Sequence, residues 1–175
     1  MKKKIAVLGS TGSIGKSTIE ILKKDKKNFD IILLTTNNNY KEILKQTKEF
    51  KVRNLIINNQ KCFIKAKKKL KKENIKIFND FESFQKKFKN KIDFTMSAIS
   101  GLEGLKPTLN IIKFSKTVAI ANKESIICAW NLIEKQLKKN KTKFIPVDSE
   151  HFSIWSLVKN IKNYKIDKIL ITASG

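Results

Sequence analysis

Cysteine is scarce in this sequence, and long apolar runs are missing. Cys62 and Cys128 are the two cysteines among 175 residues, and their spacing fits neither a disulfide framework nor a metal site. No apolar stretch approaches the roughly 20 residues of a membrane-spanning helix. The apolar run at residues 5–9 is shorter than the roughly 7–15 residues of a secretory signal core. We therefore expect a cytoplasmic protein with reduced thiols and no membrane partner.

Arginine is almost absent, although the sequence is strongly basic. Lysine and arginine total 38 against 15 acidic residues, a net charge of +23, and Arg53 is the only arginine. Proteins that read bases favour arginine, whose planar head makes paired hydrogen bonds. The lysines are spread from end to end, and abundant lysine, asparagine and isoleucine are what A/T-rich codons encode. We expect no specific nucleic-acid partner, with a non-enzymatic basic nucleic-acid-binding protein as an alternative.

Proline and glycine are also few, and no stretch rich in them forms a linker. Short apolar runs alternate with longer amphipathic ones, which predicts an α/β fold: a doubly wound, Rossmann-like parallel sheet with helices on both faces. Strands are expected at 5–8, 31–34, 54–57, 75–78, 92–96, 117–120, 144–147 and 168–172. Helices are expected at 14–24, 40–50, 61–72, 81–88, 105–114, 125–139 and 150–159.

Three glycines follow the first expected strand and open the first helix. Gly9, Gly12 and Gly15 have the spacing G-x-x-G-x-x-G. Glycine lets the backbone turn tightly and approach a pyrophosphate, and the helix N-terminus offers N–H groups to its oxygens. In this context the motif predicts a dinucleotide site, with a simple turn as the alternative.

An asparagine-rich segment ends the second expected strand. Asn37, Asn38 and Asn39 lie where this fold meets the adenosine ribose. An acidic residue there would favour NAD by binding the 2′-hydroxyl, and its absence leaves room for a 2′-phosphate. A polar turn is the alternative.

A polar segment also follows the strand expected at 117–120. Asn122, Lys123 and Glu124 come where a loop would lie over the nucleotide crevice. They are suited to the nicotinamide ribose and to an anionic substrate. The alternative is a helix start with Asn122 as its cap.

Two carboxylates follow the strand expected at 144–147. Asp148 and Glu150 are two residues apart, so in extended chain both can face one hard divalent ion such as Mg²⁺ or Mn²⁺. Two carboxylates rarely suffice, so a further ligand is missing. The alternative is a helix cap at Asp148 or Ser149, with Glu150 favoured by the helix dipole. His151 is expected on the helix surface or behind the ligands.

In this order the motifs resemble those of 1-deoxy-D-xylulose 5-phosphate reductoisomerases. The resemblance covers residues 1–175, and its most specific parts are Ala121-Asn-Lys-Glu-Ser125 and Pro146-Val-Asp-Ser-Glu-His151. It implies NADPH- and metal-dependent rearrangement and reduction of 1-deoxy-D-xylulose 5-phosphate to 2-C-methyl-D-erythritol 4-phosphate, in non-mevalonate isoprenoid biosynthesis. Another NAD(P)-dependent dehydrogenase of Rossmann type is the alternative.

The resemblance also implies residue roles. The expected NADPH-binding residues are Thr11, Gly12, Ser13, Ile14, Asn37, Asn38, Asn39, Asn122 and Glu124. Asp148 and Glu150 would bind Mg²⁺, Mn²⁺ or Co²⁺. The expected substrate contacts are Lys123, Ser149, Glu150 and Ser174, with Lys123 and Glu150 as catalytic residues. Asn37 and Asn38 depart from the family's usual Gly-Lys-Asn, which removes a cationic partner for the 2′-phosphate.

The resemblance divides the chain near Pro146. Residues 1–147 would form the NADPH-binding domain, and residues 148–175 the beginning of an incomplete catalytic domain. The active-site lid, further phosphate-binding residues, a remaining carboxylate ligand and a C-terminal helical domain are not in the sequence. We therefore expect a partial sequence that cannot complete catalysis alone and that pairs as a homodimer when full length.

Overall fold

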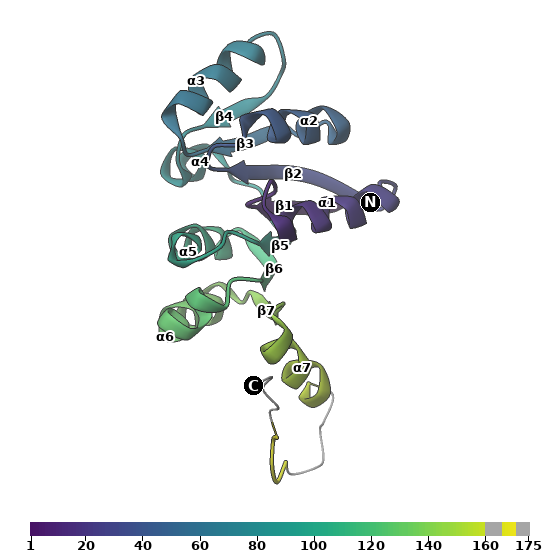
Figure 1. Ribbon diagram of the computed structural model, residues 1–175, viewed down its shortest axis with the longest axis vertical. Coiled ribbons are helices and arrows are strands. Elements are labelled where there is room, and N and C mark those ends of the chain that lie inside the picture. Colours follow the sequence, from purple (N-terminus) through teal and green to yellow (C-terminus); the bar gives the residue numbers. More distant parts are fainter. Residues whose placement is uncertain (160–165, 171–175) are drawn as a thin grey trace.

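The fold is built on one parallel sheet, in a computed structural model that describes residues 1–159 and 166–170. Its strands are β1 Lys3–Leu8, β2 Phe29–Thr36, β3 Asn54–Ile57, β4 Lys76–Phe78, β5 Ile92–Ser97, β6 Ser115–Ile120 and β7 Lys143–Pro146. They form a seven-stranded sheet in the order β4-β3-β2-β1-β5-β6-β7 (Figure 1). Every neighbouring pair is parallel.

Helices connect the strands and cover the sheet on both faces. They are α1 Ser13–Lys24, α2 Tyr40–Phe50, α3 Gln60–Lys69, α4 Phe81–Lys87, α5 Leu105–Ile112, α6 Lys123–Asn140 and α7 Ser149–Val158, with a 3-10 turn η1 Leu102–Gly104. Side chains alternate along a strand, so Ile5 and Val7 join the apolar cluster under α1–α3. Ala6 and Leu8 join the opposite cluster with α4 and α5. The doubly wound α/β prediction is confirmed.

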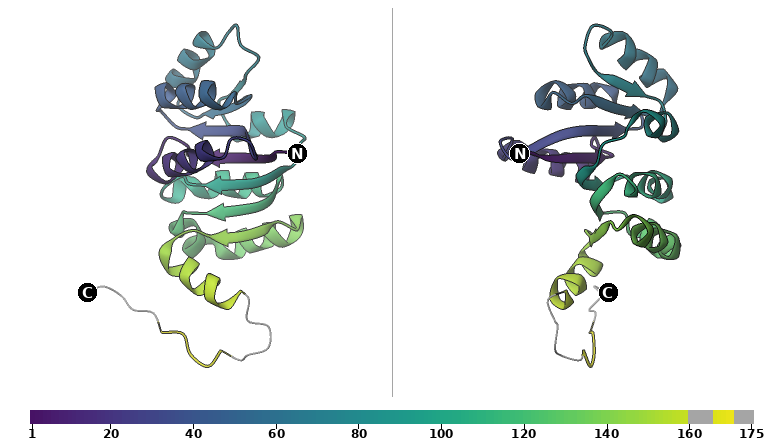
Figure 2. Two further views of the ribbon diagram at one scale, coloured as in Figure 1. Left: turned by 90° about the vertical axis from the view of Figure 1, so that its right-hand side faces the viewer. Right: turned by 180° about the vertical axis from the view of Figure 1, so that it is seen from behind.

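The strand order reverses beside β1, and this reversal positions the site. β1 pairs with β2 on one side and with β5 on the other. The chain winds outward from β1 to β4 and then from β5 to β7, as the parallel strands in Figure 2 show. In such sheets ligands bind outside the carboxyl ends of the strands at the reversal.

The short helix α4 carries the chain from the β4 edge back to β5, and an aromatic cluster holds it. Phe84 is fully buried, and its ring stacks on that of Phe88 with centroids 4.7 Å apart. The rings of Phe78 and Phe114 meet it edge-on at 5.5 and 6.0 Å. This packing fixes the start of β5, whose other end forms part of the site.

The C-terminal part differs from the sequence prediction. Residues 168–170 are exposed and have no regular structure, so the strand expected at 168–172 is wrong there, and residues 171–172 lie outside the described residues. A strand needs a neighbour to satisfy its backbone groups. The helix α7 has no buried residue, and Phe152 and Leu157 on it are exposed. Within residues 1–159 and 166–170, no helix has the length and hydropathy to cross a membrane.

Candidate functional site

The glycine loop between β1 and α1 folds tightly against β5. Gly9 has a φ of 73°, and a Cβ there would lie 2.7 Å from the carbonyl oxygen of Ala98. A Cβ at Gly15 would lie 2.1 Å from the carbonyl oxygen of Gly9. Gly12 meets no such obstacle and is the N-cap of α1. Gly9 and Gly15 therefore shape the loop, whereas Gly12 keeps the approach to the helix open.

Hydrogen bonds fix this loop to the end of β2. The Gly9 N–H donates to Thr35 Oγ1 at 2.8 Å, and the hydroxyls of Thr11 and Thr36 lie 2.7 Å apart. No side chain caps α1, and its first turn has no acidic residue. No capping side chain would therefore compete with an anion for the first-turn N–H groups.

The asparagine segment forms an ordered turn between β2 and α2. Asn39 caps α2 with its side chain, and the Asn59 side chain caps α3. The Asn37 carbonyl accepts the Asn59 N–H at 3.1 Å, and the Asn38 carbonyl accepts the Cys62 thiol at 3.0 Å. The polar-turn interpretation is therefore correct for the backbone. The Asn37 and Asn38 side chains are exposed and line the cleft described next.

Two adjoining clefts open at the carboxyl ends of the strands. The larger, about 630 Å³, is lined by Gly9, Thr11, Gly12, Thr35, Thr36, Asn37, Asn38, Asn58, Ala98, Ile99, Ser100, Glu103 and Pro107. The smaller, about 340 Å³, is lined by Ile14, Ala98, Ile99, Ser100, Ala121, Asn122, Lys123, Glu124, Asp148, Ser149 and Glu150. Residues 98–100 line both, so the clefts form a continuous path across the strand reversal.

A still larger hollow, about 1060 Å³, lies at the opposite edge of the sheet. It is lined by residues at the amino ends of strands, including Lys3, Asp93 and Lys116, and by none of the motif residues. Nucleotides bind at the carboxyl ends in this fold. The chemistry therefore belongs to the paired clefts.

Asn122 links the two loops that form the floor of the smaller cleft. Its side chain is 2% exposed, and its Oδ1 accepts the Ser125 N–H at 2.8 Å, so it caps α6. Its Nδ2 donates to the carbonyl oxygens of Ile99 and Gly101. A Cβ at Gly104 would lie 2.5 Å from that Nδ2. The cap interpretation is confirmed, and direct contact between Asn122 and a cofactor stays a prediction.

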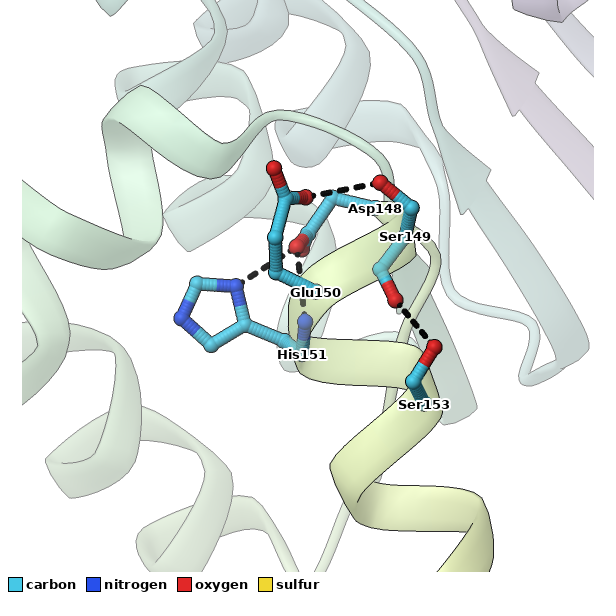
Figure 3. Close-up of polar contacts among 5 residues, drawn as sticks. All are labelled: Asp148, Ser149, Glu150, His151 and Ser153. Atoms are coloured by element: carbon cyan, nitrogen blue, oxygen red, sulfur yellow. Dashed lines mark hydrogen bonds and ion pairs between the residues drawn. The ribbon is translucent and has the colours of Figure 1, made fainter. Parts of the chain in front are cut away.

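The acidic motif lies at the start of α7, with Asp148 as the N-cap (Figure 3). Asp148 Oδ1 accepts the backbone N–H of His151 at 3.0 Å and lies 2.6 Å from His151 Nδ1. Ser149 donates its hydroxyl to Glu150 Oε2 at 2.8 Å. His151 lies behind Asp148 rather than in the lining of the smaller cleft.

Both carboxylates are ionised at neutral pH. Burial raises the pKa of Asp148, but hydrogen bonds from the backbone and ring of His151 outweigh it, and the net shift is downward. The pKa of Glu150 is lowered by its own backbone N–H, by the Ser149 hydroxyl and by the charge of Lys123. The motif thus offers two negative charges beside one positive side chain.

Asp148 caps α7 with one carboxylate oxygen, and its other oxygen is not used by the cap. Its side chain is 7% exposed, and its buried Oδ2 has no hydrogen-bond partner among the described residues. An unpaired buried carboxylate oxygen is costly, and a hard cation would satisfy it. In residues 1–159 and 166–170 no group of three or more metal-binding side chains occurs. Asp148 and Glu150 therefore fit a divalent ion as part of a larger ligand set.

The structure brings most of the predicted site residues to the paired clefts. Those that line the clefts are Thr11, Gly12, Ile14, Asn37, Asn38, Asn122, Lys123, Glu124, Asp148, Ser149 and Glu150. Ser13 and Asn39 lie beside them without lining them, and Ser174 lies outside the described residues. Sequence reasoning missed Asn58, Glu103 and residues 98–100. Asn58 and residues 98–100 come soon after expected strands, whereas Glu103 lies seven residues beyond the strand expected at 92–96.

The fold and the clefts are typical of dinucleotide-binding α/β proteins, and a carboxylate pair lines the smaller cleft. Comparison with known families is more specific. The model of the 1-deoxy-D-xylulose 5-phosphate reductoisomerase family matches residues 5–130, and the model of its C-terminal domain matches residues 144–175. The chain belongs to the 1-deoxy-D-xylulose 5-phosphate reductoisomerase family. This membership supports neither the general dehydrogenase nor the nucleic-acid-binding alternative.

Curated relatives that are named 1-deoxy-D-xylulose 5-phosphate reductoisomerase align with almost all of this chain. The reductoisomerase of Pelagibacter ubique is 61% identical over 175 residues, which is 99% of this chain and 45% of the relative. That of Clostridium perfringens strain 13 is 37% identical, over 99% of this chain and 46% of the relative. The chain thus spans about half the length of the curated relatives it matches.

Solved structures agree with this family. The Zymomonas mobilis reductoisomerase in complex with NADPH is 33% identical, with a TM-score of 0.78 over 86% of this chain and 40% of that one. A second reductoisomerase, in complex with NADPH, fosmidomycin and magnesium, is 28% identical with a TM-score of 0.78, over 88% of this chain and 38% of its own.

Proposed function

We propose that this chain provides the NADPH- and metal-binding part of a reductoisomerase. The reaction is the conversion of 1-deoxy-D-xylulose 5-phosphate to 2-C-methyl-D-erythritol 4-phosphate, for isoprenoid biosynthesis. One observation carries the proposal: a single cleft joins Ile14, at the start of α1, to Lys123, Asp148 and Glu150. A cofactor laid along the glycine loop would thus end beside the carboxylates.

The cofactor residues follow the path of the two clefts. Gly12 and the first turn of α1 would meet the pyrophosphate, and Asn38 would meet the adenosine ribose. Glu124 lines the smaller cleft and would lie at the nicotinamide end. The full proposed set is Thr11, Gly12, Ser13, Ile14, Asn37, Asn38, Asn39, Asn122 and Glu124.

The substrate and metal residues lie at the other end of the path. Asp148 and Glu150 would hold Mg²⁺, Mn²⁺ or Co²⁺, which supplies Lewis-acid polarisation of the substrate, while NADPH supplies hydride. Lys123 would hold the anionic substrate beside Glu150, since its charge already acts on that carboxylate. Ser149 and Ser174 complete the proposed substrate contacts. Lys123 and Glu150 are the proposed catalytic residues.

The domain boundary is part of the same proposal. Residues 1–147 would form the NADPH-binding domain and residues 148–175 the beginning of the catalytic domain. The start of the second family match at residue 144 and the absence of buried residues in α7 support this division. We also propose that the whole enzyme forms a homodimer and is cytoplasmic. The free thiols of Cys62 and Cys128 support the cytoplasmic location. The proposal does not include a specific nucleic-acid partner.

Binding of NADPH by the purified chain tests the proposal. A titration followed by nicotinamide fluorescence should give saturable binding, and Gly12→Val should weaken it by about tenfold or more, because a branched side chain would stand where the pyrophosphate approaches. Ser17→Val, one turn further along α1 on its exposed side, is the matched control. Absence of saturable binding in the unmodified chain would overturn the proposal.

A further inference from the structure

The larger cleft contains no cation to meet a 2′-phosphate. Its polar lining consists of backbone, hydroxyl and amide groups from residues such as Thr36, Asn38 and Asn58, and its one charged side chain is the carboxylate of Glu103. Of the 175 residues, 38 are lysine or arginine, yet none in the described part of the chain lines this cleft. The lining is thus neutral to negative in a strongly basic protein.

The lysines of the neighbouring helix α3 are directed elsewhere. Lys65 and Lys69 lie over the ring of Tyr40, with each ammonium nitrogen 5.9 and 5.8 Å from the ring centre. Neither lines the cleft. The ammonium groups of Lys65 and Lys69 are therefore held at Tyr40 and not in the lining of the larger cleft.

The backbone at the ribose position is also fixed. The Asn38 carbonyl accepts the Tyr40 N–H at 2.9 Å and the Cys62 thiol at 3.0 Å. The Asn37 carbonyl accepts the N–H of Asn59 at 3.1 Å. Since the turn is anchored to α3, residue 38 keeps its place in the lining whatever its side chain.

Two general devices set the cofactor preference of this fold, and neither occurs among the described residues that line the larger cleft. An acidic side chain after the second strand selects NAD through the 2′-hydroxyl, and a cationic side chain selects NADP through the 2′-phosphate. Neutral amides can donate hydrogen bonds to a phosphate, but they bring no positive charge to it, whereas a lysine or arginine brings both. Glu103 adds repulsion to a phosphate in the same cleft.

We propose that neutral groups alone recognise the 2′-substituent, so that this chain binds NADH nearly as well as NADPH, and that residue 38 sets this specificity. The inference rests on the proposed function, because it assumes that the larger cleft holds the adenosine half of the cofactor. It extends that function by adding NADH as a ligand of the same site.

Dissociation constants for NADPH and NADH test the proposal, measured by nicotinamide fluorescence in about 0.5 M salt. High salt is needed because the net charge of +23 attracts the more negative NADPH from a distance. We expect the two constants to differ by less than about tenfold. Asn38→Lys should tighten NADPH binding by about tenfold and change NADH binding by a much smaller factor. Glu103→Gln should tighten NADPH binding by about two- to fivefold.

Asn90→Lys is the matched control, because it adds the same charge in an exposed loop before β5, at the opposite edge of the sheet. It should change neither constant. A preference for NADPH of about a hundredfold or more in the unmodified chain, or an Asn38→Lys variant no better than the control, would overturn the inference alone. If neither nucleotide bound, the proposed function would fall, and the inference with it. Circular dichroism checks that each variant keeps the fold.

Discussion

At the scale of single residues, Asp148 combines two roles that the sequence presented as alternatives. One carboxylate oxygen caps α7 and meets the ring of His151. The other is buried without a partner among the described residues. Because the first oxygen fixes the carboxylate, the second has a defined direction. The helix cap thus prepares the proposed ligand instead of excluding it.

Replacing this carboxylate should separate metal binding from stability. Asp148→Asn keeps a capping oxygen, so the free energy of unfolding should change by less than about 1 kcal/mol. Its affinity for Mn²⁺ should fall by about tenfold or more, because a charged ligand is lost. Calorimetric titration measures the affinity. Asp80→Asn is the control, since Asp80 caps α4 in the same way but lines neither cleft, and equal losses in both variants would contradict the assignment.

Asn122 should matter more than an ordinary cap. Its side chain caps α6 and also holds the carbonyls of Ile99 and Gly101. Asn122→Ala should lower the free energy of unfolding by about 2–3 kcal/mol, because buried partners lose their hydrogen bonds. Asn39→Ala, which removes an exposed cap, should cost about 1 kcal/mol. Urea denaturation compares the two, and a cost for Asn122→Ala no larger than that of the control would contradict the role.

At the scale of elements, one side chain joins three neighbouring strands. Asp93 of β5 accepts the backbone N–H of Lys4 in β1 at 2.8 Å and pairs with the Lys116 ammonium of β6 at 2.7 Å. The pKa of Asp93 is lowered, first by the Lys116 hydrogen bond and then by that of Lys4. Two of these strands, β1 and β5, meet at the reversal of the strand order, so the contact supports the proposed site from the opposite edge of the sheet.

The sign of this shift predicts a dependence on pH. Because the folded pKa of Asp93 lies below its unfolded value, its contribution is complete above the unfolded pKa and is lost as pH falls through the folded one. Asp93→Asn should lower the free energy of unfolding by about 1 kcal/mol at neutral pH, and the difference should shrink below about pH 4. Denaturation at several pH values measures it. Glu82→Gln, which breaks an exposed 3.4 Å pair with Lys106, is the control and should have almost no effect. If Asp93→Asn lowered the free energy of unfolding by the same amount at all pH values, the assignment would be contradicted.

The elements also show what could be predicted from sequence. Short apolar runs between amphipathic segments predicted β1 to β7. These runs are apolar throughout because the strands bury side chains on both faces of a parallel sheet. The motifs converge because every parallel strand ends at the same edge. The linking role of Asn122 and the lining by Glu103 were not predictable, since both depend on how the segment after β5 packs against distant parts of the chain. The strand expected at 168–172 is wrong over residues 168–170, because no strand in the described part of the chain pairs with them.

At the scale of the whole molecule, the described fold ends in exposed apolar surface. The helix α7 buries none of its residues, although Phe152 and Leu157 belong to it. The chain covers 45% of the Pelagibacter ubique relative. Both clefts of the proposed cofactor path are present, whereas Asp148 and Glu150 would be only part of a ligand set. We therefore expect this chain to bind NADPH but not to catalyse the reaction.

The purified chain should bind NADPH without turning over substrate. With 1-deoxy-D-xylulose 5-phosphate and Mg²⁺ present, the rate of NADPH oxidation, followed by absorbance, should not exceed that of the Asp148→Asn control. The reason is that two carboxylates rarely complete a site for a hard divalent ion. Metal-dependent oxidation well above the control would show that the site is complete without further polypeptide.

In the proposed site, cofactor and metal meet in one cleft of this chain. The most direct measurement is the broadening of the proton NMR signals of bound NADPH by Mn²⁺. We predict strong broadening of the nicotinamide protons, weaker broadening of the adenine protons and loss of both effects in Asp148→Asn, because the smaller cleft joins the nicotinamide end to Asp148 and Glu150. Saturable binding of both ligands with no selective broadening of the nicotinamide protons would contradict the account.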